Sequence, residues 1–250
     1  MGDLPQQRPG VNKESVSYDS YEQMADYYFK DVDTKPFNAY YERPATVSLL
    51  PENLKGLSIL DAGCAAGWYT NWLLDRGACV TALDFSPGMI EMTKKRVGNK
   101  ARVLRADLNE PLDFIPDRSM DMVLSSLTLH YIKDWKPVMG EFSRVLKNEG
   151  SLVFSVHHPF MDFTVFEREN YFVTELLEDE WDTPEGKVKV RFYRRPLNSI
   201  LSSVIDAGFI VEKLLEPMPT ELFKKEQPEV YEGLTNHPHF LFIKARKAGK

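Results

Sequence analysis

Apolar and polar positions follow an alternating plan through most of the chain. Short apolar runs typical of buried parallel strands occur at 57–63, 78–86, 101–108, 120–132 and 151–160. Segments with apolar residues at helical spacing separate them, at 67–77, 86–98 and 136–150. This alternation predicts right-handed crossovers and a mostly parallel sheet with helices on both faces.

The alternation stops after residue 161. Val188, Val190 and Phe192 alternate with basic side chains behind a Pro-Glu-Gly turn signal, which predicts an inserted antiparallel hairpin or small sheet. A helix and two more strands are then expected, at 196–209, 209–217 and 239–247. The predicted fold is therefore a Rossmann-like, doubly wound α/β sheet of seven strands.

The N-terminal part differs from this core. Residues 1–15 are polar with Pro and Gly, which predicts a mobile tail. Residues 16–52 are rich in tyrosine at helical spacing, with Pro44 near a helix start. They form either a helical cap or a lid whose phenol groups, Tyr28 among them, close over a ligand. The expected divisions are a tail at 1–15, a helical cap at 16–52, a cofactor-binding core at 53–161, an inserted β lid at 162–195 and the rest of the core sheet at 196–250.

Composition narrows the function classes. The 250 residues are 43% hydrophobic and 27% charged, as in a soluble globular protein with one large domain. A net charge of −6 does not favour nonspecific binding to DNA or RNA. Cys64 and Cys79 form no disulfide framework, and no ligand spacing predicts a metal. The sequence has no membrane-length apolar run or signal segment, so a cytoplasmic location is expected.

The stretch from Leu57 to Thr70 is the most informative part of the sequence. An apolar strand ends at Asp61, and a run of small residues follows to Gly67 before a helix begins. Small residues let the backbone approach a ligand closely, and a helix start offers unpaired N–H groups. An ordinary strand-to-helix turn without a ligand is the alternative.

Three acids favour a ligand at this turn. Asp61, Asp84 and Asp107 each stand at the carboxyl end of a predicted strand, the edge where open α/β sheets bind ligands. Asp84 lies about twenty residues beyond the glycine turn, the spacing at which a carboxylate reaches a ribose hydroxyl pair. The three acids and the turn together predict a nucleoside-containing cofactor.

The spacing of small residues distinguishes between cofactors. A dinucleotide fingerprint would need glycine at positions where this chain lacks it. The pattern Asp61-x-Gly63-x-Ala65-x-Gly67 instead resembles the first motif of class I S-adenosylmethionine-dependent methyltransferases, with Ala65 in place of the middle glycine. That resemblance implies S-adenosylmethionine as cofactor and S-adenosylhomocysteine as product, with Cys64 also in the binding turn.

The resemblance extends over about residues 57–160. Segment 82–96 resembles the second motif and implies Asp84 as the ribose ligand, while Phe85 and Met89 are candidates for walls around the adenine. Segments 105–112 and 117–135 resemble the third and fourth motifs. They imply an adenine site at Ala106, Asp107 and Leu108, and place Ser125 and Ser126 beside the methionine part. The family also implies an antiparallel last strand, and its ubiquinone/menaquinone-type small-molecule members look most similar.

The family implies in-line methyl displacement, for which the protein mainly aligns the reactants. A general base is needed only if the acceptor must lose a proton. His130, after the fourth strand, is the best candidate base, although it could simply pack in its loop. His157 and His158 are adjacent strand residues that point to opposite sides, so at most one faces a pocket; His157 is the second catalytic candidate.

The acceptor itself is not determined by the sequence. The absence of a basic tail favours a small molecule over RNA. An RNA-modifying enzyme would be supported by a basic groove of Lys94, Lys95, Arg96, Arg102 and Arg105. A non-catalytic protein that only binds the cofactor is a third possibility. The acceptor atom stays open, as does the choice between monomer and homodimer.

Overall fold

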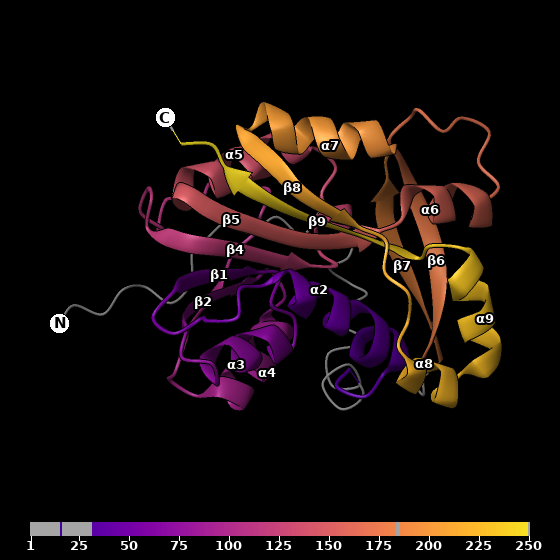
Figure 1. Ribbon diagram of the computed structural model, residues 1–250, viewed down its shortest axis with the longest axis horizontal. Coiled ribbons are helices and arrows are strands. Elements are labelled where there is room, and N and C mark those ends of the chain that lie inside the picture. The colour runs from indigo at the N-terminus through magenta and orange to yellow at the C-terminus, as the bar shows by residue number, and fades with distance from the viewer. Residues whose placement is uncertain (1–15, 17–31, 184–185, 250) are drawn as a thin grey trace.

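A seven-stranded sheet forms the centre of the computed structural model, which describes residues 16, 32–183 and 186–249. The strand order is β3-β2-β1-β4-β5-β9-β8 (Figure 1). β1 to β5 are parallel, and β9 is antiparallel to both β5 and β8. The predicted fold class is confirmed. The strands are β1 (Ser58–Ala62), β2 (Cys79–Asp84), β3 (Arg102–Arg105), β4 (Met120–Ser126), β5 (Leu146–His157), β8 (Phe209–Leu215) and β9 (Phe240–Lys247).

Helices cover both faces of the sheet (Figure 1). One face packs against α2 (Arg43–Leu49), α3 (Trp68–Leu74) and α4 (Pro87–Val97), and the other against α5 (Trp135–Val145) and α7 (Leu197–Asp206). Ser86 caps α4 as its sequence suggests, because its Oγ accepts a hydrogen bond from the Met89 N–H at 3.1 Å. Pro87 occupies the first helical position, where its missing N–H costs nothing.

One predicted helix ends earlier than expected. The helix predicted over 136–150 stops at Val145, because Leu146 already pairs with Met120 and begins β5. The segment 120–132, predicted as a strand that opens into a loop, is a strand to Ser126 and continues into the 3₁₀ turn η2 (Leu129–Tyr131). At Leu146 strand pairing overrides a helical pattern that the local sequence permits.

A group of smaller elements lies beyond the carboxyl ends of β4 and β5 (Figure 1). The predicted antiparallel insertion is present as β6 (Glu175–Thr183) and β7 (Gly186–Arg194), with Glu175 opposite Arg194. The strand predicted to run to residue 160 ends at His157, and Pro159 instead begins an unforeseen helix. The remaining elements are η1 (Asn38–Glu42), α6 (Pro159–Val165), α8 (Glu221–Glu226) and α9 (Pro228–Asn236).

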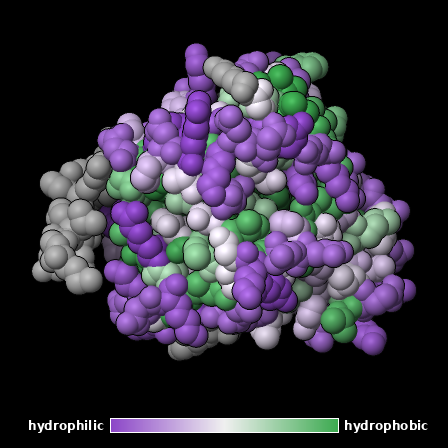
Figure 2. Space-filling model, turned by 60° about the vertical axis from the view of Figure 1, so that its left-hand side comes forward, coloured by the Kyte–Doolittle hydropathy of each residue, from purple (hydrophilic) through white to green (hydrophobic). Residues whose placement is uncertain are grey.

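Polar side chains predominate on the face shown in Figure 2, with smaller hydrophobic areas between them. The largest buried cluster lies between the sheet and helices α5 and α7. Among the described residues, no helix combines the length and apolarity that crossing a membrane requires. The expected tail and the tyrosines at 18, 21 and 28 lie outside the described residues.

Candidate functional site

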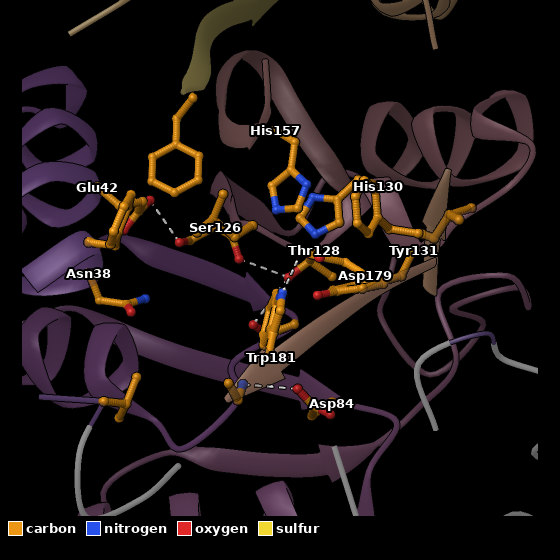
Figure 3. Close-up of a pocket in the computed structure, with 18 of the residues that line it drawn as sticks. Asn38, Glu42, Asp84, Ser126, Thr128, His130, Tyr131, His157, Asp179 and Trp181 are labelled. Atoms are coloured by element: carbon orange, nitrogen blue, oxygen red, sulfur yellow. Dashed lines mark hydrogen bonds between the residues drawn. The ribbon is translucent and has the colours of Figure 1, made fainter. Parts of the chain in front are cut away.

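A pocket of about 540 Å³ opens at the carboxyl edge of the sheet (Figure 3). It has two parts. The strand-end half is formed by the glycine turn and the residues after β2 and β3, namely Gly63, Cys64, Ala65, Asp84, Phe85, Ala106, Asp107 and Leu108. The histidine chamber is formed by His130, Tyr131, His157, Met161, Asp162, Phe192 and Phe240. The structure thus brings most predicted site residues to one cavity.

The shape of the glycine turn depends on missing side chains. Gly63 has φ +88°, and a Cβ there would lie 2.1 Å from Thr128 Oγ1. Gly67 has φ +77°, and its Cβ would lie 2.9 Å from the Thr93 side chain. Ala65 adopts φ +46°, so the methyl group that replaces the usual glycine is accommodated in a left-handed turn. The backbone therefore stays close to the cavity.

Asp84 is held at the pocket wall by its own turn. One carboxylate oxygen accepts a hydrogen bond from the Ala65 N–H and the other from the Ser86 N–H, both at 2.9 Å. Figure 3 shows Asp84 at the strand-end side of the cavity. Asp107 is positioned in a similar way, since one of its oxygens accepts from the Asn109 backbone and side chain at 2.9 and 2.8 Å.

Four predicted cofactor residues lie outside the pocket lining, and Tyr28 lies outside the described residues. Asp61 is 1% exposed and accepts a hydrogen bond from Thr70 Oγ1 at 2.6 Å, and burial raises its pKa to about 7. Ser125 Oγ donates to the Ala62 carbonyl at 2.8 Å, which joins β4 to β1. Met89 is fully buried, and Gly67 precedes α3. These four residues belong to the structure around the turn and not to the pocket wall.

Glu42 is a pocket residue that the sequence did not reveal. Its carboxylate is 1% exposed and accepts four hydroxyl hydrogen bonds of 2.7 to 2.8 Å. The donors come from four different elements: Thr46, Tyr69, Ser126 and Ser155. No motif separates this glutamate from a surface residue, because its donors converge only in the folded chain.

The two catalytic candidates meet in the chamber. The rings of His130 and His157 stack with centroids 4.1 Å apart (Figure 3). Burial lowers the pKa of His157 to about 3, with a smaller contribution from His239, and burial also places the pKa of His130 well below its usual range. Both imidazoles are therefore neutral near pH 7. His158 points away and contacts Glu216 at 2.7 Å, as the strand alternation predicts.

Asp162 joins the histidine pair from α6, another residue that no motif revealed. Its Oδ1 lies 3.7 Å from His157 Nδ1, and burial raises its pKa to about 8. Both His130 ring nitrogens, His157 Nδ1 and Asp162 Oδ1 are buried without a hydrogen-bond partner among the described residues. Buried polar atoms are normally satisfied, so this cluster is suited to a polar group of a ligand.

The inserted hairpin reaches over both parts of the pocket. Figure 3 shows Trp181 between the strand-end half and the chamber. Trp181 Nε1 donates to Asp179 Oδ2 at 3.0 Å, and Lys35 Nζ lies 5.4 Å from the Trp181 ring centre. Within the described ranges no group of three or more His, Cys, Asp or Glu side chains could hold a metal ion. The expectation that no metal binds stays a prediction.

Comparison with known proteins places this site in context. Residues 60–154 match the family model described as a methyltransferase domain. An uncharacterised protein of Haemophilus influenzae is 28% identical over 242 residues, which cover 85% of this chain and 89% of that protein.

Two further similarities carry functional names. A malonyl-[acyl-carrier protein] O-methyltransferase of Serratia marcescens is 35% identical over 100 residues, only 40% of this chain and 38% of that enzyme. The crystal structure of an S-adenosylmethionine-dependent methyltransferase from Mesorhizobium loti aligns with a TM-score of 0.68 and 27% identity. That alignment covers 86% of this chain and all of the other.

Proposed function

Because the chain belongs to the class I S-adenosylmethionine-dependent methyltransferases, we propose that it methylates a small molecule bound in the histidine chamber. One observation carries this proposal: a single cavity joins the strand-end half to a buried chamber with unpartnered polar atoms. The strand-end half suits the cofactor, and the chamber is left for a second ligand. The match to the Serratia relative spans too little of that enzyme to indicate its substrate here.

The strand-end half fits the cofactor by shape and by donor chemistry. Asp84 would accept from the ribose hydroxyls, and the segment 106–108 would border the adenine. The turn from Gly63 to Ala65 provides a close backbone surface that a Cβ at Gly63 would disturb. S-adenosylmethionine supplies a methyl group that its sulfonium already activates, so the protein needs chiefly to align and shield the reactants.

Glu42 extends this half toward the chamber. Its carboxylate bonds to Ser126, which the family resemblance associates with the methionine part of the cofactor. A carboxylate with four hydroxyl donors and little solvent exposure projects a negative potential into the cavity. We propose that this potential favours the positively charged sulfonium over the neutral thioether of the product.

The chamber contributes shielding and a proton acceptor. Burial keeps His130 and His157 neutral but also lowers their basicity, so either imidazole can accept a proton from a group that becomes strongly acidic as the methyl group bonds to it. The aromatic walls Phe192 and Phe240 keep water from the reacting atoms. The proposed residue roles are thus cofactor binding by the strand-end half and acceptor binding by the chamber.

The RNA alternative receives little support from the basic side chains proposed for it. Arg96 forms an ion pair with Asp33 at 2.9 Å. Arg105 donates to the Phe85 carbonyl at 2.9 Å, and Arg102 lies over the Phe114 ring. These three guanidinium groups serve contacts within the chain rather than a continuous basic groove.

The test is methyl transfer from labelled S-adenosylmethionine into a fractionated cell extract. We expect label in the small-molecule or lipid fraction. Label in nuclease-sensitive material would instead establish RNA as the acceptor. If the protein binds the cofactor but no fraction becomes labelled, the result would favour a non-catalytic cofactor-binding protein.

A further inference from the structure

We infer that the acceptor is an uncharged molecule that presents a hydroxyl group on a flat apolar body, an inference that rests on the proposed function above. Among the described residues, the chamber combines aromatic walls with a few buried polar atoms that have no hydrogen-bond partner, and none of its lining side chains is a lysine or arginine. This combination disfavours carboxylate and protonated amine acceptors and suits an acceptor with a hydroxyl group. It also separates the chain from enzymes that methylate a carboxylate.

A carboxylate acceptor would find no positive partner in the chamber. Among the described residues that line the pocket, the basic ones other than histidine are Lys35 and Arg43, both in the N-terminal cap. Arg43 donates to the Val32 carbonyl at 2.8 Å and stacks on Trp68 at 4.3 Å. The chamber instead contains Asp162, with Asp179 nearby in the pocket lining. Among the described chamber residues, an acceptor anion would exchange its hydration for neutral donors, the imidazole N–H groups and the protonated Asp162 carboxyl, without a countercharge.

Two arginines near the chamber do not change this conclusion. Arg194 donates to Glu175 at 2.9 Å and to the carbonyls of Asn170, Tyr171 and Val173 at 2.8 to 3.0 Å. Arg195 donates to the Ile132 carbonyl and lies over the Trp135 ring. Neither residue belongs to the described lining of the pocket.

A hydroxyl group fits the polar atoms of the chamber. Each neutral imidazole has one N–H donor and one acceptor nitrogen, and a hydroxyl group can both donate and accept. A protonated amine would offer donors only, and it would also approach the cofactor's sulfonium as a like charge. An uncharged hydroxyl group can therefore satisfy the stacked histidine pair on both sides.

The shape of the chamber favours a flat body. The Phe192 ring stands edge-on to His157 at 4.6 Å and to His130 at 6.0 Å. Phe240 lies nearly parallel to His157 at 6.2 Å. These rings and Tyr131 present planar apolar surfaces on which an aromatic acceptor can pack face-on or edge-on.

Methylation of a hydroxyl group also requires the release of one proton. The acceptor oxygen gains a C–O bond to the methyl group as the C–S bond breaks, and the electron pair of that bond stays on sulfur as a neutral thioether. The hydroxyl proton becomes strongly acidic as the C–O bond forms, so it can pass to a neutral imidazole, for which we name His157. Asp162, which burial keeps protonated near pH 7, lies beside this histidine, with its Oδ1 3.7 Å from His157 Nδ1.

The first experiment measures binding and needs no methyl transfer. The full-length protein, saturated with S-adenosylhomocysteine, is titrated with 2-naphthol, 2-naphthoate and 2-naphthylmethylamine, three probes with the same ring and different charge. We expect 2-naphthol to bind at least tenfold more tightly than either charged probe. Equal binding of all three, or preference for the carboxylate or the amine, would overturn the inference.

A variant pair locates the binding. His157→Phe keeps a ring in the chamber and removes both nitrogens, and we expect it to reduce 2-naphthol affinity about tenfold. His237→Phe is the matched control, because His237 is exposed and lies outside the pocket lining. His130→Asn serves as a second variant if the first fails to fold. Unchanged 2-naphthol affinity in folded His157 and His130 variants would contradict the assignment.

The second experiment examines the natural product. Label transferred from S-adenosylmethionine is treated with mild alkali, which releases a methyl ester as methanol and leaves a methyl ether intact. We expect alkali-stable label on oxygen. Alkali-labile label would show a carboxylate acceptor and overturn the inference while confirming methyl transfer, whereas absent label would count against the proposed function.

Discussion

The two parts of the pocket differ in how they are built. The strand-end half consists of consecutive strand–turn–helix units whose backbone atoms and short loops hold Asp84 and Asp107 in place. The histidine chamber draws single side chains from η2, β5, α6, β7 and β9. The first depends on local backbone geometry, and the second depends on where distant elements meet. This difference leads to different responses to mutation.

The largest effect is expected in the chamber, from Asp162→Asn. Burial raises the pKa of Asp162 to about 8, so the folded wild type holds a proton that the unfolded chain has lost above about pH 4. The contribution of Asp162 to the free energy of unfolding of the wild type therefore falls as the pH rises toward 8. The isosteric amide does not titrate. Relative to the wild type, the free energy of unfolding of the variant should therefore rise by up to about 3 kcal/mol between pH 5 and 8.

Urea denaturation of both proteins at several pH values measures this difference. Asp162 is surrounded by His157, Arg194 and Asp179, all of which both proteins retain. A constant difference in unfolding free energy across this range would show that Asp162 is ionised in the folded state. The chamber would then be more polar than its burial indicates.

Gly63→Ala tests the strand-end half. The new Cβ would meet Thr128 at 2.1 Å, and Gly63 has φ +88°. We expect a loss of about 2 to 3 kcal/mol in unfolding free energy together with weaker cofactor binding. Gly140→Ala in α5 is the matched control, since no atom lies within 4 Å of its added Cβ and alanine favours a helix. Wild-type stability for Gly63→Ala would contradict the account of the turn.

Asp84→Ala tests the cofactor assignment directly. The substitution removes the proposed ribose ligand and the carboxylate that accepts a hydrogen bond from the Ala65 N–H. It should weaken S-adenosylmethionine binding at least 100-fold, about 2.7 kcal/mol. Isothermal titration calorimetry measures the affinity, and circular dichroism shows whether the variant is folded. Unchanged affinity in a folded variant would eliminate Asp84 as the ribose ligand.

The smallest expected effect concerns charge selection by Glu42. Glu42→Gln should lower affinity for S-adenosylmethionine about tenfold and affinity for the neutral product by less than about threefold. Glu52→Gln, at an exposed position, is the control. Equal losses for both ligands would indicate a purely structural role for the carboxylate and its four hydroxyl donors.

The two parts of the pocket were not equally predictable from the sequence. Asp84 and the glycine turn were recognisable because their functions depend on spacing within one strand–turn–helix unit. The histidines were recognised only as single candidates after strands. Glu42 and Asp162 were not recognised, because nothing in their local sequence distinguishes them from ordinary surface residues.

The boundaries of several elements also required the folded chain. Leu146 continues the helical pattern of the preceding residues, yet it pairs with Met120 in the sheet. Pro159 lies within the run that was predicted as a strand to residue 160, and it instead begins α6, which brings Asp162 to His157. Contacts between residues far apart in the sequence determine such boundaries, so a local sequence pattern cannot predict them.

By itself the sequence determined the order of the main strands and helices, the small-residue turn and the acids at the strand ends, because these follow from apolar periodicity and from the close backbone approach that small residues allow. Only the tertiary structure decided which side chains share the chamber, which of the adjacent histidines faces it, and that Glu42 has four hydroxyl donors. The physical reason is burial: the pKa values and unpartnered atoms of the chamber arise when residues far apart in the sequence exclude water together.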